Sequence, residues 1–378
     1  MAKQPKDNSE STDTSKNLLG ALLQGYKEDH YNLTEPLLTS VSSGSLILDQ
    51  YVKFTQGVHR LTGYSQSGKT SEALLVGKNL IEKYKDIDGG CKGLYIKAEG
   101  RISENIQKRS GMKFTANADE WDNGSVFIYH GNIFESICAI IESLIKHCYE
   151  KKTRLFIIID SVDGLRLKSD IGNDIGKEKV AGPQLIMKRF LTRVALPIDR
   201  YGVVCFAISQ VSSSIKIDPY SKEIPRMTSG SGGWALAHSA NIILDFEHRN
   251  NSDYILQKPK DKPDPVDNKI IGHWTTVRVV KSDDEKENIK VKYPIKHGRV
   301  GGSVWTEYEI IDLLYTFDVL KKKGAWYAFE DGFRKELEGV GFKTEEQYHG
   351  EAEVFALLEN NAALTKYLYD KFSKMLMS

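Results

Sequence analysis

The apolar residues of the chain gather in short continuous runs, and stretches with helical periodicity separate these runs. The predicted strands are residues 58–62, 93–96, 126–129, 155–159 and 203–208. The predicted helices between them are residues 70–84, 133–149 and 185–198. Strands that are apolar throughout, rather than at every second position, are typical of a parallel sheet covered on both faces. The pattern therefore predicts an α/β fold with a mostly parallel central sheet.

Beyond residue 240 the apolar runs follow one another without long helices between them. The predicted strands here are residues 241–246, 274–280 and 289–293. We expect them to extend the sheet in an antiparallel manner, because short connections suit antiparallel pairs. A helical pattern then runs from Tyr308 to about Lys323, before a Gly-Ala-Trp-Tyr-Ala-Phe run and a mixed helical tail. Residues 306–378 are therefore predicted to form a small C-terminal α+β domain.

The amino-terminal part of the chain changes character near residue 16. Residues 1–15 carry few apolar side chains and are expected to be a disordered tail. From Lys16, with Ser15 as the N-cap, leucines recur on one helix face that Tyr26 continues. Residues 16–38 are thus predicted to be a helix and a linker, and residues 39–305 the core. The helix either packs on its own core or docks on a neighbouring subunit, and its pattern favours neither.

The charges of the chain nearly balance, with 52 Lys and Arg against 51 Asp and Glu, a net charge of +1. This excludes a uniformly basic nucleic-acid coat protein but leaves room for a local basic groove. The four cysteines form no paired motif, so we expect a reducing compartment and no zinc site. No apolar run approaches the ~18 residues that span a bilayer, and the chain begins without a secretory signal pattern. The expected location is the cytoplasm, with no membrane partner.

The segment from Gly63 to Thr70 matches the phosphate-loop pattern G-x-x-x-x-G-K-[ST] between a predicted strand and a predicted helix. Small residues let backbone N–H groups surround a phosphate at a helix N-terminus, where Lys69 reaches the outer phosphates. The predicted nucleotide-binding residues are Gly63, Tyr64, Ser65, Gln66, Ser67, Gly68, Lys69, Thr70 and Ser71. ATP is therefore the predicted cofactor.

Three further predicted strands end in residues that suit chemistry on this nucleotide. Asp160 ends a buried strand and is predicted to hold Mg²⁺ together with the Thr70 hydroxyl, although such an Asp can also cap a turn. Glu99 follows another strand and could activate a water molecule, or be an ordinary surface Glu. Gln210 follows a third strand, where a neutral amide can report the γ-phosphate to the next loop. The predicted catalytic residues are therefore Glu99 and Gln210, together with Lys69 of the phosphate loop.

Two long polar stretches follow these strands, at residues 168–183 and 211–233. Their lysines, arginine and glycines suit contact with a nucleic-acid backbone, although each stretch alone is also compatible with a solvated loop. The predicted DNA-binding residues are Lys177, Lys179, Lys216, Arg226, Gly232 and Gly233.

A set of short motifs, in this order, resembles the RecA family of recombinases. The motifs are Ser43–Asp49, Ala98-Glu99, Asp160-Ser161-Val162, Ser209-Gln210, Gly232-Gly233-x-Ala-Leu236, Glu309–Asp312 and Gly324-Ala-Trp-Tyr327. The last two look like the entrance to the C-terminal domain of bacterial RecA and its phage relatives of the UvsX type. The resemblance covers roughly residues 43–327. The sequence lacks the strongly acidic C-terminal tail of bacterial RecA, and in this respect it resembles a phage-type recombinase.

The resemblance implies a RecA-like phosphate-loop ATPase core and roles for individual residues. Glu99 would match the water-activating carboxylate, and Gln210 the residue that couples ATP to the second DNA-binding loop. Residues 168–183 and 211–233 would match the two DNA-binding loops, and the N-terminal helix the element that docks on the adjacent subunit. Lys281 would match one of two catalytic lysines that reach the neighbouring subunit's ATP.

Some positions depart from the family pattern. Asp283 stands where the second interfacial lysine is expected, so either Lys286 or Arg278 replaces that lysine or the interfacial chemistry is weaker. Ile106 lies near the place of the aromatic residue that stacks on adenine. Glu307 is a poor match for a second adenine-contacting aromatic residue, for which the neighbouring Trp305 or Tyr308 are the alternatives.

Together the residues and the resemblance predict an ATP- and Mg²⁺-dependent strand-exchange recombinase that forms helical filaments. The expected partners are single-stranded DNA, double-stranded DNA, other copies of the chain, and single-strand-binding and mediator proteins. The expected setting is a prokaryotic cell or a phage-infected host. The alternatives are a ring-forming motor of the same fold, such as a helicase or loader, and a DNA-coating filament with little ATP turnover.

Overall fold

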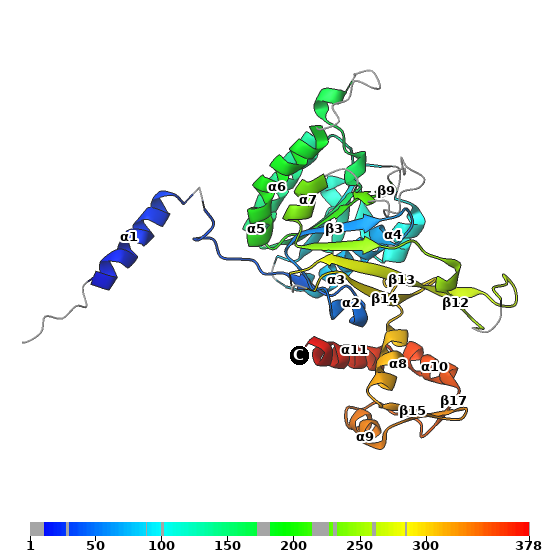
Figure 1. Cartoon of the computed structure of the whole chain (residues 1–378). Helices are drawn as coiled ribbons and strands as arrows, with labels where there is room; N and C mark the ends of the chain where they lie inside the picture. Colours follow the sequence, from blue (N-terminus) through cyan, green and yellow to red (C-terminus); the bar gives the residue numbers. More distant parts are fainter. Residues whose placement is uncertain are drawn as a thin grey trace, which may run out of the picture.

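The computed structural model in Figure 1 describes residues 11–27, 30–87, 89–99, 102–171, 182–213, 227–229, 233–258, 262–283 and 286–377. The large sheet contains β3 (Gly57–Gly63), β4 (Cys91–Lys97), β5 (Lys113–Thr115), β6 (Ser125–His130), β7 (Arg154–Asp160), β8 (Val204–Ile208), β11 (Ile242–Phe246), β12 (Tyr254–Leu256), β13 (Ile270–Lys281) and β14 (Ile289–Lys296). The smaller sheets contain β1 (Ser40–Val41), β2 (Phe54–Thr55), β9 (Val211–Ser213), β10 (Met227–Ser229), β15 (Leu320–Lys323), β16 (Trp326–Phe329) and β17 (Tyr348–His349).

The helices of the described residues lie between and after these strands. They are α1 (Ser11–Gly25), α2 (Leu46–Asp49), α3 (Lys69–Tyr84), α4 (Glu104–Ser110), α5 (Phe134–Glu150), α6 (Gly182–Arg200), α7 (Gly233–Ser239), α8 (Thr306–Thr316), α9 (Asp331–Gly339), α10 (Glu351–Asn360) and α11 (Ala362–Met377). Short 3₁₀ helices are η1 (Ala118–Glu120), η2 (Val162–Gly164), η3 (Lys168–Asp170) and η4 (Asn251–Asp253).

The large sheet has the strand order β12-β13-β11-β3-β8-β7-β4-β6-β5, with β14 also paired to β13. All neighbours from β11 to β5 are parallel, whereas β13 is antiparallel to β11, β12 and β14. The predicted α/β fold with a mostly parallel sheet is confirmed. The expectation for residues 241–246 is wrong in direction, because β11 is parallel to β3. The connection from β8 to β11 carries α7, and a long connection of this kind can return the chain in the same direction.

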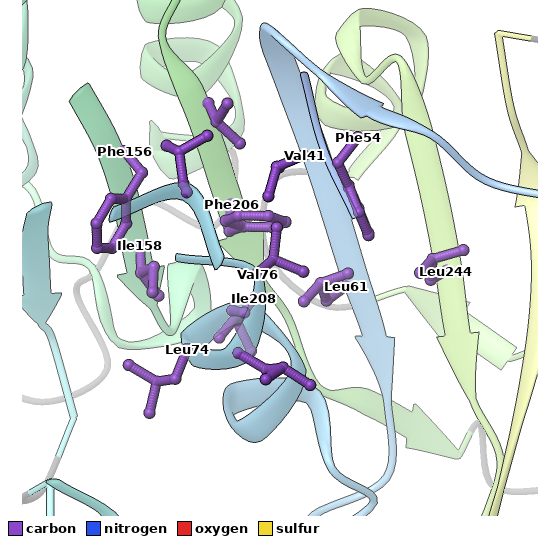
Figure 2. Packing of buried hydrophobic residues seen from close by; sticks show 14 of the residues in the cluster. Val41, Phe54, Leu61, Leu74, Val76, Phe156, Ile158, Phe206, Ile208 and Leu244 are labelled. Atoms are coloured by element: carbon purple, nitrogen blue, oxygen red, sulfur yellow. The ribbon is translucent and has the colours of Figure 1, made fainter. Parts of the chain in front are cut away.

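Helices cover both faces of this sheet and bury it in two apolar clusters. One cluster joins α3 to the strands and includes Leu61, Leu74, Phe156 and Phe206, several of which are labelled in Figure 2. The other cluster joins α5 and α6 to the opposite face. Figure 1 shows α5, α6 and α7 on one side of the sheet and α3 on the other. Burial on both faces explains why the predicted strands are apolar throughout.

Two glycines allow α3 to approach the sheet closely over Phe156. The Phe156 side chain is completely buried. A Cβ atom on Gly93 of β4 would lie 2.3 Å from Phe156 Cζ, and one on Gly77 of α3 would lie 2.6 Å from Phe156 Cε2. The ring of Phe156 therefore occupies the space that any larger residue at either glycine would need. This contact sets how α3 lies against β7, the strand that ends in Asp160.

Residues after 305 form a unit whose apolar cluster joins α8 to α11 and β15 to β17 with Leu46 of α2. The helical pattern predicted to reach Lys323 is wrong beyond Thr316, where α8 ends. The chain turns instead through Gly324, at a φ of +66°, to pair β15 with β16. This unit is attached to the core through Glu309, which accepts hydrogen bonds from Ser45 Oγ at 2.5 Å and from the Leu46 N–H at 2.8 Å.

Most of the apolar face of helix α1 is exposed in the described part of the chain. Leu18, Leu19 and Leu22 are each at least half exposed, and Figure 1 shows α1 standing apart from the sheet and its helices. The interpretation that this helix packs on its own core is therefore wrong for the described residues. The helix also begins at Ser11, so a disordered tail is wrong for residues 11–15, because Ser, Thr and Asp are residue types that favour helix starts. Residues 1–10 lie outside the described residues. The described helices include none with the length and apolar character that crossing a membrane requires.

Candidate functional site

The predicted phosphate loop forms the turn between β3 and α3. Gly63 and Gly68 adopt φ values of +138° and +112°, which L-residues with side chains rarely adopt. A Cβ atom on Gly63 would lie 2.3 Å from the Phe246 carbonyl oxygen, so this glycine is also required by close packing. Tyr64, Ser65 and Gln66 are exposed at the tip of the turn. The backbone N–H groups at the start of α3 are therefore open to an anion.

Lys69 occupies the place within this loop that a phosphate-binding lysine requires. Its Nζ donates hydrogen bonds to the carbonyl oxygens of Gly63, at 2.8 Å, and Tyr64. Burial lowers the pKa of Lys69, while the carboxylates of Asp160 and Asp163 oppose this shift. The ammonium group is thus held by the loop's own acceptors, which phosphate oxygens can replace. This turn, with its two glycines and Lys69, fits the phosphates of a nucleoside triphosphate.

Thr70 and Asp160 meet at the first turn of α3, as the sequence predicts. Thr70 Oγ1 donates a hydrogen bond to Asp160 Oδ2 at 3.0 Å, and the Tyr95 hydroxyl donates to the same oxygen. The buried hydroxyls of Thr62, near the carboxyl end of β3, and Ser161, directly after β7, have no hydrogen-bond partner among the described residues. Hydroxyl and carboxylate oxygens are the ligands that Mg²⁺ prefers, so this group of atoms fits that ion.

Glu99 and Gln210, which lie far apart in the sequence, are brought into contact at the same sheet edge. Gln210 Nε2 donates a hydrogen bond to Glu99 Oε2 at 3.4 Å. The contact exists because Glu99 follows β4 and Gln210 follows β8, and both strands flank β7. The backbone N–H of Gln210 also donates to Asp163 Oδ2 at 2.6 Å. The sequence alone gives no signal for Asp163, since it lies in a turn without a recognisable motif.

Lys281 lies beside the amino end of β11, whereas the phosphate loop of its own chain lies beside the carboxyl end of that strand. It pairs in register with Ile243 at the start of β11, whereas Gly63 pairs with Phe246 at the end of that strand. Its Nζ donates to the carbonyl oxygens of Ala240 at 2.6 Å and His238 at 3.2 Å. The structure therefore does not bring Lys281 together with Lys69 within one chain.

The two candidates to replace the second interfacial lysine differ in their surroundings. Arg278 is held in an ion pair with Glu247, at 3.3 Å. Lys286 follows Lys281 in the turn between β13 and β14, and its Nζ donates to the Gln50 carbonyl oxygen at 2.6 Å. Lys286 is therefore the candidate on the same sheet edge as Lys281.

A cavity of about 740 Å³ opens beside the phosphate loop, between the start of α3, the loop after β14, and α4. Ile106, which lies near the expected place of the adenine-stacking aromatic residue, lines it, and so do His273 and His297. These two histidines are hydrogen-bonded, with His273 Nδ1 2.7 Å from His297 Nε2. Burial, with a smaller contribution from Arg249, lowers the pKa of His273 to about 3, so this ring is neutral near pH 7. A neutral aromatic wall of this kind suits a nucleobase.

Trp305 and Tyr308 do not line this cavity but pack against each other and Phe355. Glu307 is buried in an ion pair with Arg299, at 2.7 Å. Trp305 and Tyr308 thus lie outside this cavity, whereas His297 lines it. The signal that could have identified it is the His-Gly pair directly after β14, at the carboxyl end of a strand.

The second predicted DNA-binding loop begins directly after Gln210, and the described start of the first is η3, which contacts α5 through the hydrogen bond from the Lys168 N–H to Glu135. Lys177, Lys179, Lys216, Arg226 and Gly232 lie outside the described residues. Gly233 begins α7. The second loop is not irregular throughout, because β9 and β10 pair in an antiparallel ladder directly after Gln210. Gln210 therefore stands where this hairpin leaves the sheet.

Comparison with known proteins gives one consistent group of relatives. No family model matches the chain. The RecA protein of Rickettsia africae is 28% identical over 303 residues, which cover 78% of this chain and 76% of that protein. The RecA protein of Rickettsia bellii is 28% identical over 301 residues, and that of Campylobacter fetus 26% identical over 302 residues, at similar coverage. The resemblance and the RecA-like core that the motifs predicted are confirmed by these homologues.

Proposed function

We propose that this homologue of the RecA-type recombinases is a DNA-dependent ATPase that forms helical filaments on single-stranded DNA and exchanges DNA strands. The relatives support the coarser part of the proposal, a role in DNA recombination and repair. The contact between Gln210 and Glu99 is the observation that carries the finer part. It joins a residue at the base of a predicted DNA-binding loop to the predicted catalytic carboxylate, so DNA and ATP can act on the same pair of side chains.

ATP and Mg²⁺ are the proposed cofactors. The loop from Gly63 to Ser71 would surround the phosphates, and Thr70 and Asp160 would hold the metal ion. The bound ion would neutralise negative charge that develops on the phosphate oxygens. Lys69 would exchange its hydrogen bonds to the carbonyl oxygens of Gly63 and Tyr64 for bonds to phosphate oxygens. The nucleoside would occupy the cavity lined by Ile106 and His297.

Glu99 is the proposed general base. Its Oε2 accepts the Gln210 amide hydrogen bond, so the second carboxylate oxygen remains to take a proton from the attacking water. The same hydrogen bond restrains the Glu99 side chain. A shift of Gln210 would therefore change the orientation of the base and the start of β9 together.

The filament is proposed from features that a single chain leaves incomplete. The apolar face of α1 is exposed, and we propose that it docks on the adjacent subunit. Lys281 lies at the opposite end of the strands from its own phosphate loop. In this position the lysine could complete the ATP site of a neighbouring subunit. A head-to-tail contact of this type builds an open helix when its rotation does not close into a ring. Lys286 is the proposed second lysine.

Residues 168–183 and 211–233 are proposed to bind the DNA backbone, single-stranded first and double-stranded during exchange. Backbone binding by Lys and Arg would be weakly selective for sequence and sensitive to salt. Base pairing rather than the protein would then read homology. We also propose the division into a helix and linker, a core to residue 305, and a C-terminal domain, with single-strand-binding and mediator proteins as partners.

The test is ATP hydrolysis with and without single-stranded DNA at two salt concentrations, beside the variant Lys69→Ala. We expect strong stimulation by DNA that weakens with salt, and no turnover in Lys69→Ala because the outer phosphates lose their cation. Asp199→Asn, an exposed substitution at the end of α6, is the matched control and should behave as wild type.

Electron microscopy of the same DNA complexes separates the proposal from its alternatives. Open helical filaments with turnover support a recombinase, whereas closed rings that unwind duplex DNA would indicate a motor. Filaments without stimulated turnover would indicate a DNA-coating protein.

A further inference from the structure

A buried arginine, Arg60, contacts the strand end that carries Gln210. Arg60, in the middle of β3, is only 3% exposed, and its Nε donates a hydrogen bond to Ser209 Oγ at 3.1 Å. One terminal nitrogen of its guanidinium group has no hydrogen-bond partner among the described residues. A buried guanidinium requires compensating negative charge. The pKa of Arg60 is lowered by burial, and the charges that oppose this shift are those of Asp163 and Asp245.

Asp163 connects this buried arginine to Gln210. It lies in η2, directly after the metal-binding end of β7. Its Oδ2 accepts the backbone N–H of Gln210 at 2.6 Å, a short hydrogen bond of the charge-assisted kind. Arg60 holds Ser209, the residue before Gln210. The end of β8 is therefore held at two consecutive residues by two charges that attract each other.

The same turn touches the catalytic carboxylate. A Cβ atom on Gly164, which follows Asp163, would lie 2.2 Å from Glu99 Cγ. A larger residue there would displace the Glu99 side chain, so the turn is packed directly against that side chain. Asp163 also lies close enough to the phosphate loop for its charge to act on Lys69. One short turn thus lies between the phosphate-binding lysine, the proposed base and the start of the second loop.

We propose that Asp163 is a positioning residue that holds Gln210 against Glu99 and transmits the charge state of the phosphate loop to the second DNA-binding loop. Asp163 shares its charge between Lys69, Arg60 and the Gln210 amide. When Lys69 turns to an anion in the loop, Asp163 loses part of one attraction and rebalances toward the other two. The position of Gln210, and of the hairpin that begins after it, changes with that balance. This inference rests on the proposed function, because it assigns Asp163 to the same ATP site and loop.

The first test needs neither ATP nor DNA. Amide hydrogen exchange at Gln210 is compared in the wild type, Asp163→Ala, Asp163→Asn and the control Asp199→Asn. We expect exchange at Gln210 to be about ten- to a hundredfold faster in Asp163→Ala, because a hydrogen bond to a charged acceptor is lost. Asp163→Asn keeps an oxygen acceptor without the charge and should fall between Asp163→Ala and the wild type. Unchanged exchange at Gln210 in both Asp163 variants would refute the inference.

The second test measures the ratio of ATP turnover with DNA to turnover without it. We expect this ratio to fall toward one in Asp163→Ala and to fall less in Asp163→Asn, with a smaller change in KM for ATP than in the DNA-stimulated kcat. A purely structural role would lower both rates together and leave the ratio unchanged. If Asp163→Ala does not fold, Asp163→Asn carries both comparisons.

The two proposals fail in different ways. A wild-type protein that DNA does not stimulate would refute the proposed function and the transmitting role of Asp163, whatever its variants do. A stimulated wild type with an unchanged ratio in both Asp163 variants would refute only the role of Asp163.

Discussion

Replacement of Gly93 by alanine should destabilise the core by overpacking it at Phe156. The added Cβ would lie 2.3, 2.7 and 2.9 Å from three atoms of the Phe156 ring. That ring cannot swing into solvent, because it is completely buried between α3 and the sheet. Overpacking of this kind costs about 1–3 kcal/mol. We expect the upper part of this range, because contacts under 3 Å require β4 and β7 to shift.

Urea unfolding measures the effect, with Gly339→Ala as the matched control. Gly339 ends α9, and a Cβ added there meets no atom within 4 Å. The control should therefore be neutral or slightly stabilising, by up to about 1 kcal/mol. The double variant Gly93→Ala with Phe156→Leu should recover part of the loss, since the smaller side chain leaves room for the new Cβ.

A Gly93→Ala protein within about 0.5 kcal/mol of the wild type, the range of neutral surface substitutions, would show that the reasoning is wrong. Additive effects of the two substitutions would equally refute it, because residues in contact should couple by about 0.5–3 kcal/mol. The same contact sets how α3 meets β7. We therefore also expect weaker nucleotide binding in Gly93→Ala.

Three further predictions concern the site and the stability of the protein. Glu99→Gln should keep ATP binding but slow hydrolysis by about 10²–10⁴-fold and leave filaments that persist; fast turnover in single-turnover assays would remove Glu99 from the role of base. Lys281→Ala and Lys69→Ala should each be inactive with DNA, yet a mixture of the two should regain turnover, because mixed filaments contain interfaces with both lysines; no recovery would argue against a role across the interface. Burial raises the pKa values of Glu72 and Glu309 from 4.5 to about 8, so the folded state binds protons that the unfolded state has lost. The free energy of unfolding should therefore fall as pH rises from about 4.5 to 8, and Glu309→Gln should flatten this dependence; an unchanged slope in thermal unfolding would contradict the assignment.

Local features of the sequence were sufficient for much of the fold and part of the site. The continuous apolar runs predicted the parallel strands, because a strand buried on both faces has no polar side. The phosphate loop and its lysine were predicted because all the required residues are adjacent in the chain, from Gly63 to Thr70. The position of Asp160 beside this loop followed from the rule that parallel strands have their carboxyl ends on the same side of the sheet, where ligands bind.

Other features depend on which strands become neighbours, and the sequence does not state that order. Gln210 meets Glu99 because β8 and β4 both flank β7, although β8 and β4 are far apart in the chain. The direction of β11 and the early end of α8 depend on packing against distant elements, which local periodicity does not encode.

The sequence alone thus determined which residues suit the chemistry of the site, and the tertiary structure determined which side chains those residues contact. Asp163 illustrates the difference. As one acidic residue in a turn it carries no recognisable pattern, and only the fold places it between Arg60, Lys69 and the Gln210 amide. Lys281 is a second example, because only strand pairing places it at the opposite end of the strands from its own phosphate loop. Short-range periodicity specifies the elements, whereas charge contacts between elements exist only after long-range packing has set the strand order.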